Sequence, residues 1–286
     1  MLMLEVARMK RSLLAGLVAV TSAACGAPRA APITGDISSA LAHGIEHGSA
    51  RFDHGSWDEL VQRHVRDGGR RFDYVGLKAD EEQFEAYLGA LATTDVSALS
   101  ANEIQALFAN AYNAYTIRTI LEHVSADGAF DIKSIRDVPD VFGRKDHTVG
   151  GFLLSLDNME HNVLRPLFKD PRVHFALNCA SISCPPLPKR AFTGDEIDEQ
   201  LDTVTRNTLT DPDYVSVDGD ALLVTRIMDW YGGDFVNPEY KGSGRSLSEF
   251  IAPFATTEVR EFVTAHDDNV SVSVKFRDYD WTLNRP

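Results

Sequence analysis

Two cysteines are the residues whose types and spacing best suit chemistry. Cys179 and Cys184 are separated by four residues in the stretch HFALNCASISCPPL, residues 174–187, where an alternating apolar run precedes them and two prolines follow. A cysteine serves as a nucleophile, a metal ligand, a disulfide partner or a small buried hydrophobe, depending on its neighbours. The other residues of the chain have to decide among these four alternatives.

A nucleophilic cysteine needs a base beside its sulfur, and His174 lies in the same stretch. Residues 173–178 alternate between two faces, which predicts a strand. At about 3.3 Å per residue, the Cα atoms of His174 and Cys179 would lie roughly 16 Å apart, beyond the reach of a side-chain hydrogen bond. We therefore expect the base to come from another element, and we interpret His174 as an ordinary strand histidine with a polar neighbour.

The nearest such element is a helix predicted over residues 156–164, with Ser155 as its cap. This helix carries Glu160 and His161. The sharpest hypothesis is Cys179 as nucleophile, His161 as base and Glu160 as the group that orients the base. Adjacent helix positions differ by about 100° in direction, so both side chains cannot point squarely at one spot.

Three asparagines are candidates for orienting the base or for stabilising an oxyanion, namely Asn178, Asn110 and Asn113. The last two lie on a predicted helix that begins with a capping box at Ser100 and Glu103 and has apolar residues on both sides. Asparagines on a helix that is covered on both sides need hydrogen-bond partners in the interior. The simpler interpretation is that they anchor this helix to the strand.

The disulfide is the default state for two cysteines in an exported, oxidising setting. A Cys179–Cys184 bridge needs Cα atoms about 4.4 to 6.8 Å apart, which a compact turn permits and an extended segment does not. Metal binding is weaker as a hypothesis. His147, His161, His174, Glu160 and the cysteines supply ligand types, but HExxH and CxxC spacings are absent. His147 also remains a second candidate base.

The first residues have the layout of an export signal. A basic region, an apolar run over residues 13–20 and small residues follow one another, and this segment is too short for a permanent transmembrane helix. We expect a signal peptide over 1–25, a flexible lead over 26–50 and one domain over 51–286. Cys25 resembles a lipoprotein processing site, although Ser22 stands where such sites usually carry Leu, so lipidation and plain cleavage both remain open. The protein is expected to be periplasmic, membrane-anchored or secreted.

The charge of the chain excludes one class of partner. The formal net charge is −14, and the basic leader makes the remainder still more acidic. Phosphate backbones would repel such a body, so we expect no nucleic-acid partner. A membrane tether is expected only through a lipidated Cys25.

The remaining periodicities predict an α+β fold with several helices packed on a small mixed or antiparallel sheet. Helical spacing covers residues 82–92, and a capping pattern at Thr193 and Glu196 precedes a helix up to residue 208. A hairpin is expected about Asp218-Gly219, and residues 270–276 alternate as a last strand.

Five blocks in order resemble the DUF547 family, a domain of unknown function: FANAYNAYTIRTILEH, GGFLLSLDNMEHNVLR, DPRVHFALNCASISCPPL, DEIDEQLDTVTRNTL and IMDWYGGDF. The resemblance extends from roughly Phe72 to Asn284 and implies a shared fold, but it supplies no reaction.

The leading functional hypothesis is a thiol-dependent hydrolase or acyl-transfer enzyme that is centred on Cys179 and needs no cofactor. Its substrate would be an amide or ester, such as a peptide or ester of the cell envelope. The alternative is a noncatalytic binding or scaffold module with a structural Cys179–Cys184 disulfide. A metal-dependent hydrolase using His161 and His174 ranks third.

Overall fold

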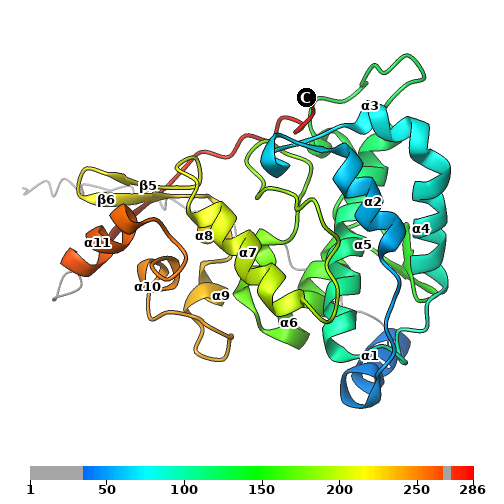
Figure 1. Cartoon of the computed structure of the whole chain (residues 1–286), viewed down its shortest axis with the longest axis horizontal. Coiled ribbons are helices and arrows are strands. Elements are labelled where there is room, and N and C mark those ends of the chain that lie inside the picture. Colours follow the sequence, from blue (N-terminus) through cyan, green and yellow to red (C-terminus); the bar gives the residue numbers. More distant parts are fainter. Residues whose placement is uncertain (1–34, 267–271) are drawn as a thin grey trace, which may run out of the picture.

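The computed structural model describes residues 35–266 and 272–286. The expected signal peptide and Cys25 lie outside these residues, as does Val270 of the expected last strand. Within the described ranges the fold is α+β, with helices predominating and the strands gathered in small sheets (Figure 1). No helix in these ranges is long and apolar enough to cross a membrane.

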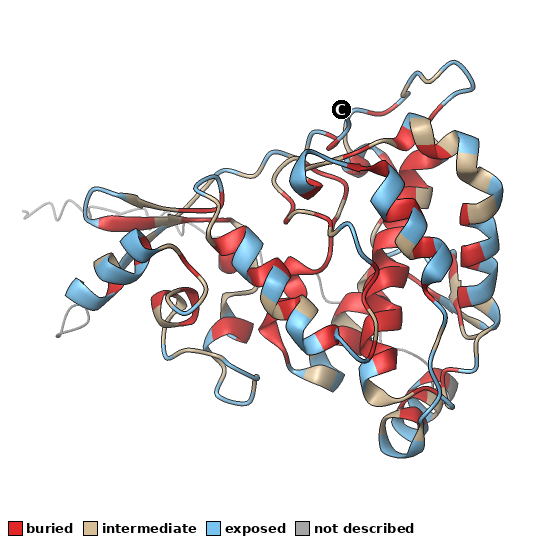
Figure 2. Cartoon of the chain, viewed as in Figure 1, coloured by how far each residue is buried: buried red, intermediate tan, exposed pale blue. Residues whose placement is uncertain are grey.

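Helix α5 (Ala101–Leu121) is the centre of the fold, and nearly all of its side chains are buried (Figure 2). It begins as predicted, because the Ser100 hydroxyl accepts the backbone N–H of Glu103 at 3.3 Å. The expected capping box is only half formed. The carboxylate of Glu103 accepts the N–H of Gly194 instead, so it joins α5 to a distant loop rather than to its own cap.

Four helices cover one side of α5: α1 (Gly35–His47), α2 (Gly55–His64), α3 (Tyr74–Leu77) and α4 (Glu81–Thr93) (Figure 1). Helix α4 confirms the helical spacing of residues 82–92. Helix α1 falls within the segment 26–50 that was expected to be a flexible lead, and its Ile37 and Leu41 are buried in the core. Their spacing of four residues puts both side chains on one helical face, which supplies the apolar burial that a flexible segment lacks.

Three small sheets accompany the helices in the described ranges. The pairs β1 (Val65–Arg66) with β2 (Arg71–Phe72) and β3 (His147–Val149) with β4 (Phe152–Leu154) are antiparallel. The third sheet is mixed: β5 (Val215–Asp218) and β6 (Ala221–Val224) form the predicted hairpin, and β7 (Ser273–Phe276) pairs parallel to β6. Gly219 in the hairpin turn has φ +62°, a conformation that glycine adopts without strain.

The strand predicted over residues 173–178 is wrong. Residues Pro171–Phe175 form the short 3₁₀ helix η5, which Asp170 caps by accepting the N–H of Arg172 at 3.0 Å. A cap followed by proline at the first helical position starts a helix. The alternation carried no information about faces, because every side chain from Pro171 to Asn178 is buried.

The helix predicted over 156–164 exists but does not stop near Pro166. Ser155 caps it as expected, since its hydroxyl accepts the N–H of Asn158 at 3.1 Å. The chain then forms the π-helical segment η4 (Asn158–Leu164) and continues into α6 (Arg165–Phe168). Proline is tolerated there because it lies in the first turn of α6. π-Helical turns occur frequently at functional sites.

Helix α7 (Ile197–Leu209) also begins without the capping box expected at Thr193 and Glu196, since no side chain caps its first turn. The C-terminal part of the chain adds α8 (Ile227–Trp230), α9 (Gly232–Val236), α10 (Leu247–Ile251) and α11 (Thr257–His266). In Figure 1 these helices lie with the third sheet on the side of the molecule away from α4.

Candidate functional site

A pocket of about 450 Å³ lies where η4, η5, α8, the C-terminal segment and the cysteine loop, defined as residues 179–184, meet. One part of its wall contains both cysteines, and another contains the acidic and histidine side chains of Asp157, Glu160, His161 and His174. Aromatic rings form much of the rest: Tyr112, Phe142, Trp230, Tyr231, Tyr279 and Trp281. An apolar pocket with a few convergent polar groups is the usual form of a small-molecule site.

Cys179 and Cys184 form a disulfide, with their Cα atoms 6.2 Å apart. Cys179 is partly exposed toward the pocket, whereas Cys184 is buried. The turn between them is tight, and Ala180 within it has φ +60°. The disulfide is therefore the state of the pair in this structure, and a thiol nucleophile would require its reduction.

The sulfur atoms contact hydroxyl groups. The Tyr279 hydroxyl lies 3.2 Å from the Cys179 sulfur and 3.1 Å from the Cys184 sulfur. Ser181 Oγ lies 3.3 Å from the Cys184 sulfur and 3.0 Å from the Tyr279 hydroxyl. Among the described residues, no histidine forms a hydrogen bond with either sulfur. A Cys–His dyad is therefore not assembled in the oxidised site.

A C-terminal strap, defined as residues 278–284, places Tyr279 over the cysteine loop. Backbone hydrogen bonds join Ile182 N–H to Thr282 O at 2.9 Å and Asn284 N–H to Ala180 O at 3.1 Å. The Asn284 side chain is buried and donates to Asn178 Oδ1 at 3.2 Å. Sequence reasoning missed Tyr279. Its only signal was the aromatic segment YDWTLN, which nothing in the sequence connects to the cysteines.

The three candidate asparagines bind backbone groups, and none of them lines the pocket. Asn113 donates to Ala176 O at 2.9 Å and accepts the N–H of Asn178 at 2.8 Å. Asn178 donates to Pro185 O at 2.9 Å and accepts the N–H of Ala180 at 2.9 Å. Asn110 makes the same kind of two-sided contact with Phe192. These contacts match the simpler interpretation that the asparagines are interior anchors.

His174 lies between two carboxylates. Its Nε2 is 2.9 Å from Asp234 Oδ2, and its Nδ1 is 3.5 Å from Glu160 Oε1. Arg165 donates to both oxygens of Asp234, at 2.7 and 2.9 Å. Burial opposes the ionisation of Asp234, but the hydrogen bonds from His174 and Arg165 outweigh it and hold the pKa of this carboxyl well below its usual range. Asp234, from α9, is a further residue that sequence reasoning missed.

One ring nitrogen of His161 is occupied by a hydrogen bond from Arg165. Arg165 Nη1 lies 3.1 Å from its Nδ1, and because a guanidinium only donates, the imidazole proton is on Nε2. That nitrogen faces Asp157 Oδ1 at 3.8 Å. Burial lowers the pKa of His161, and the neighbouring Arg165 adds to this effect although Glu160 opposes it. The ring is therefore neutral at neutral pH, with its acceptor nitrogen already engaged.

Asp157 is the carboxyl best suited to proton transfer. Burial raises its pKa to about 6, and the nearby charge of Glu160 contributes. A group with a pKa near the working pH is an efficient general acid or base. Glu160 behaves differently: burial opposes its ionisation, but hydrogen bonding to His174 and Tyr231 lowers its pKa. Asp157 lies one helical turn before His161, a spacing that sequence reasoning overlooked.

The second candidate base, His147, lies outside the pocket. It belongs to β3, is buried and stacks on Tyr115 with the ring centroids 4.7 Å apart. Burial lowers its pKa to about 4. It is therefore a neutral core side chain.

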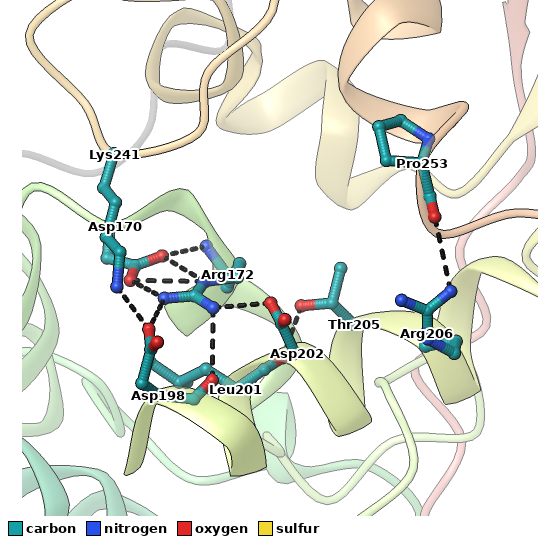
Figure 3. Close-up of polar contacts among 9 residues, drawn as sticks. All are labelled: Asp170, Arg172, Asp198, Leu201, Asp202, Thr205, Arg206, Lys241 and Pro253. Atoms are coloured by element: carbon teal, nitrogen blue, oxygen red, sulfur yellow. Dashed lines mark hydrogen bonds and ion pairs between the residues drawn. The ribbon is translucent and has the colours of Figure 1, made fainter.

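An arginine cluster fixes the turn that carries His174 (Figure 3). The side chain of Arg172 is buried and binds both oxygens of Asp170, at 2.9 and 2.6 Å. It also binds Asp198 and Asp202 on α7, and Lys241 contacts the same oxygen of Asp198. The hydrogen bonds and charges of these carboxylates raise the pKa of Arg172 despite burial. Because Arg172 is two residues from His174, this cluster sets the position of η5 against α7.

No group of three or more His, Cys, Asp or Glu within residues 35–266 and 272–286 is arranged to hold a metal ion.

Comparison with known proteins gives one match. Residues 96–208 match the family model described as "Protein of unknown function, DUF547". No curated protein and no solved structure matches the chain significantly. The matched residues include α5, η4, the cysteine loop and most of α7, and therefore much of the pocket wall. The chain thus contains a DUF547 domain over residues 96–208.

Proposed function

We propose that this protein is a thiol-dependent hydrolase or acyl-transfer enzyme that acts on an amide or ester of the cell envelope through reduced Cys179. The observation that carries the proposal is the pocket, in which a partly exposed cysteine and a carboxyl with a pKa near neutrality line one cavity with aromatic walls. The DUF547 match is compatible with this proposal but does not name an activity.

In this proposal the reduced Cys179 sulfur attacks the substrate carbonyl, the C–O or C–N bond to the leaving group breaks, and the acyl group remains on the sulfur as a thioester. The leaving alcohol or amine takes up the proton that the thiol lost, and water or a second acceptor then releases the acyl group from the sulfur. Ionised Asp157 accepts the proton of the Cys179 thiol and passes it to the leaving group, and His161, whose Nε2 lies 3.8 Å from Asp157 Oδ1, is its neighbour in the pocket. Glu160 keeps the expected part of orienting His161. The aromatic rings of Trp230 and Trp281 would contact the apolar part of the substrate.

The test uses p-nitrophenyl acetate as an ester probe, with the full chain before and after reduction. We expect a burst of nitrophenol and an acetyl adduct on the Cys179 peptide of the reduced protein only. Cys179→Ser abolishes both. Cys184→Ser leaves Cys179 without its disulfide partner, so it reacts without reductant. An adduct that survives in Cys179→Ser, or a reduced wild type that forms none, refutes the proposal.

The pH dependence of the acylation rate distinguishes a catalytic role of Asp157 from a structural one. Ionised Asp157 is the proposed base, so the acylation rate should rise as the pH increases through about 6. Asp157→Asn should lose this limb of the profile while the Cys179 thiol still reacts with iodoacetamide. An unchanged profile in the variant refutes the role of Asp157.

The disulfide favours one alternative, a noncatalytic binding or scaffold module that the Cys179–Cys184 bridge stabilises. This alternative predicts that reduction lowers stability and reveals no acylation at Cys179.

Export of the protein is part of the proposed function, with a signal peptide over 1–25 and either lipidation at Cys25 or plain cleavage. Mass analysis of the N-terminal peptide from the membrane and soluble fractions of expressing cells tests it.

A further inference from the structure

We propose that the Cys179–Cys184 pair is a redox-active disulfide that exchanges with a dithiol small enough to enter the pocket. This activity is independent of the ester chemistry proposed above. It rests on an asymmetry between the two sulfur atoms: Cys179 is the more exposed, whereas Cys184 is 3% exposed and accepts the backbone N–H of Cys179 in addition to the Tyr279 and Ser181 hydroxyls that lie near both sulfurs.

Three donors converge on the Cys184 sulfur. The backbone N–H of Cys179 lies 2.9 Å from it, the Tyr279 hydroxyl 3.1 Å and the Ser181 hydroxyl 3.3 Å. A disulfide sulfur is a weak acceptor and gains little from such an arrangement, whereas a thiolate is an anion and gains much more. The surroundings of Cys184 therefore fit its reduced, negatively charged form.

Tyr279 is suited to this part because it remains protonated. Burial raises the pKa of its hydroxyl, so the group keeps the proton that it donates. The strap holds it in place, since Asp280 N–H donates to Ser183 Oγ at 2.9 Å and Ser183 N–H donates to Asp280 O at 3.3 Å. The donor is thus fixed over the sulfur before reduction, and little reorganisation is needed when the charge develops.

The exchange proceeds in two steps. A thiolate of the dithiol attacks the Cys179 sulfur, the S–S bond breaks, and its electron pair leaves on Cys184, where the three donors bind the thiolate. The second thiol of the reductant loses its proton and attacks the reductant sulfur of the mixed disulfide, which releases Cys179. The dithiol is oxidised to a disulfide and the cysteine pair gains two electrons. Of the two protons released, Cys179 takes one, and water takes the other while Cys184 remains a thiolate.

The experiment is a redox titration of the native full chain against graded ratios of reduced and oxidised dithiothreitol. After alkylation, peptide mass analysis reports the pair separately from Cys25. We expect a reversible equilibrium in the folded protein. Tyr279→Phe should shift it toward the disulfide by about tenfold, because a hydrogen bond to the thiolate is lost. Ser181→Ala should shift it in the same direction by a smaller factor.

Tyr214→Phe is the matched control. The Tyr214 hydroxyl donates to the backbone oxygen of Cys184 at 2.6 Å. This variant therefore loses a buried hydroxyl that binds the backbone of the same loop and not its sulfur atoms. We expect its equilibrium to stay within about twofold of wild type. A pair that dithiothreitol reduces only after the protein unfolds is structural and overturns the proposal. Equal shifts in Tyr279→Phe and Tyr214→Phe overturn the donor role of Tyr279. The titration contains no ester, so its outcome does not depend on the acylation assay.

Discussion

Replacing Asn113 by alanine should release the segment that leads into the cysteine loop. Asn113 is 2% exposed on α5, and its side-chain amide bridges Ala176 O and Asn178 N–H. Alanine makes neither hydrogen bond. Because the surrounding residues are buried, water does not replace the lost partner without opening the structure.

The magnitude follows from the two backbone groups left without their partner. Each buried donor or acceptor that loses its hydrogen bond costs about 1–3 kcal/mol, so the loss of two should lower the free energy of unfolding of Asn113→Ala by about 2–6 kcal/mol. Domains are usually stable by about 5–15 kcal/mol, so we expect a weakened but folded protein. Urea denaturation measures the change.

Asn110→Ala is the matched control, because Asn110 is 1% exposed on the same helix. Its amide donates to Phe192 O at 2.8 Å and accepts Phe192 N–H at 3.0 Å. The two variants should therefore lose similar stability. Only Asn113→Ala should speed the reduction of the Cys179–Cys184 disulfide in the folded state, because only Asn113 binds the backbone next to Cys179.

Two results would refute this reasoning. A loss below about 0.5 kcal/mol in Asn113→Ala would show that the amide contacts do not stabilise the fold. Equal acceleration of disulfide reduction in both variants would show that global weakening, and not the local anchor, exposes the cysteine loop.

Three further predictions concern residues outside the cysteine loop. The folded-state pKa of Asp157 is raised to about 6, so the fold favours the protonated carboxyl. The stability linked to that proton is lost as the pH rises from about 4 through about 6. Asp157→Asn should therefore stabilise the protein more at neutral than at acidic pH in urea titrations. His147, with its pKa lowered to about 4, has the opposite sign: stability falls as the pH drops below about 6.5, and His147→Gln should flatten that fall. Lys169 ends α6 with φ +47°, so Lys169→Gly should melt about 2–4 °C higher than Lys169→Ala by calorimetry.

The central helices could be predicted from the sequence because their apolar spacing is decided locally. Helix α5 shows its apolar stripe and its cap within its own residues, and the need of Asn110 and Asn113 for interior partners follows from the burial of that helix on both sides. The segment Pro171–Phe175 could not be predicted in this way. It is buried on every side, so neither period 2 nor period 3.6 marks a solvent-facing side.

The site was predictable only as far as its residues share one stretch of chain. Glu160, His161 and Cys179 were identified because their types are reactive and they lie close in sequence. Tyr279 enters the pocket from the C-terminal strap, and Asp234 of α9 binds the pocket residue His174; only tertiary packing brings either residue to the site. No local pattern distinguishes either residue from an ordinary surface carboxylate or aromatic side chain.

The separation expected between His174 and Cys179 assumed a strand that the structure does not contain. An extended chain would separate the two Cα atoms by roughly 16 Å. Residues Pro171–Phe175 instead form a 3₁₀ helix, and His174 and Cys179 line different parts of the same pocket. Proximity does not make His174 a base for the thiol, because its two nitrogens face Asp234 and Glu160. The groups that contact sulfur are the hydroxyls of Tyr279 and Ser181. Hydroxyls that keep their protons stabilise a thiolate but do not accept the proton of a thiol, so the proposed base has to be a group that does not contact sulfur, which is the part proposed for Asp157 in the same pocket.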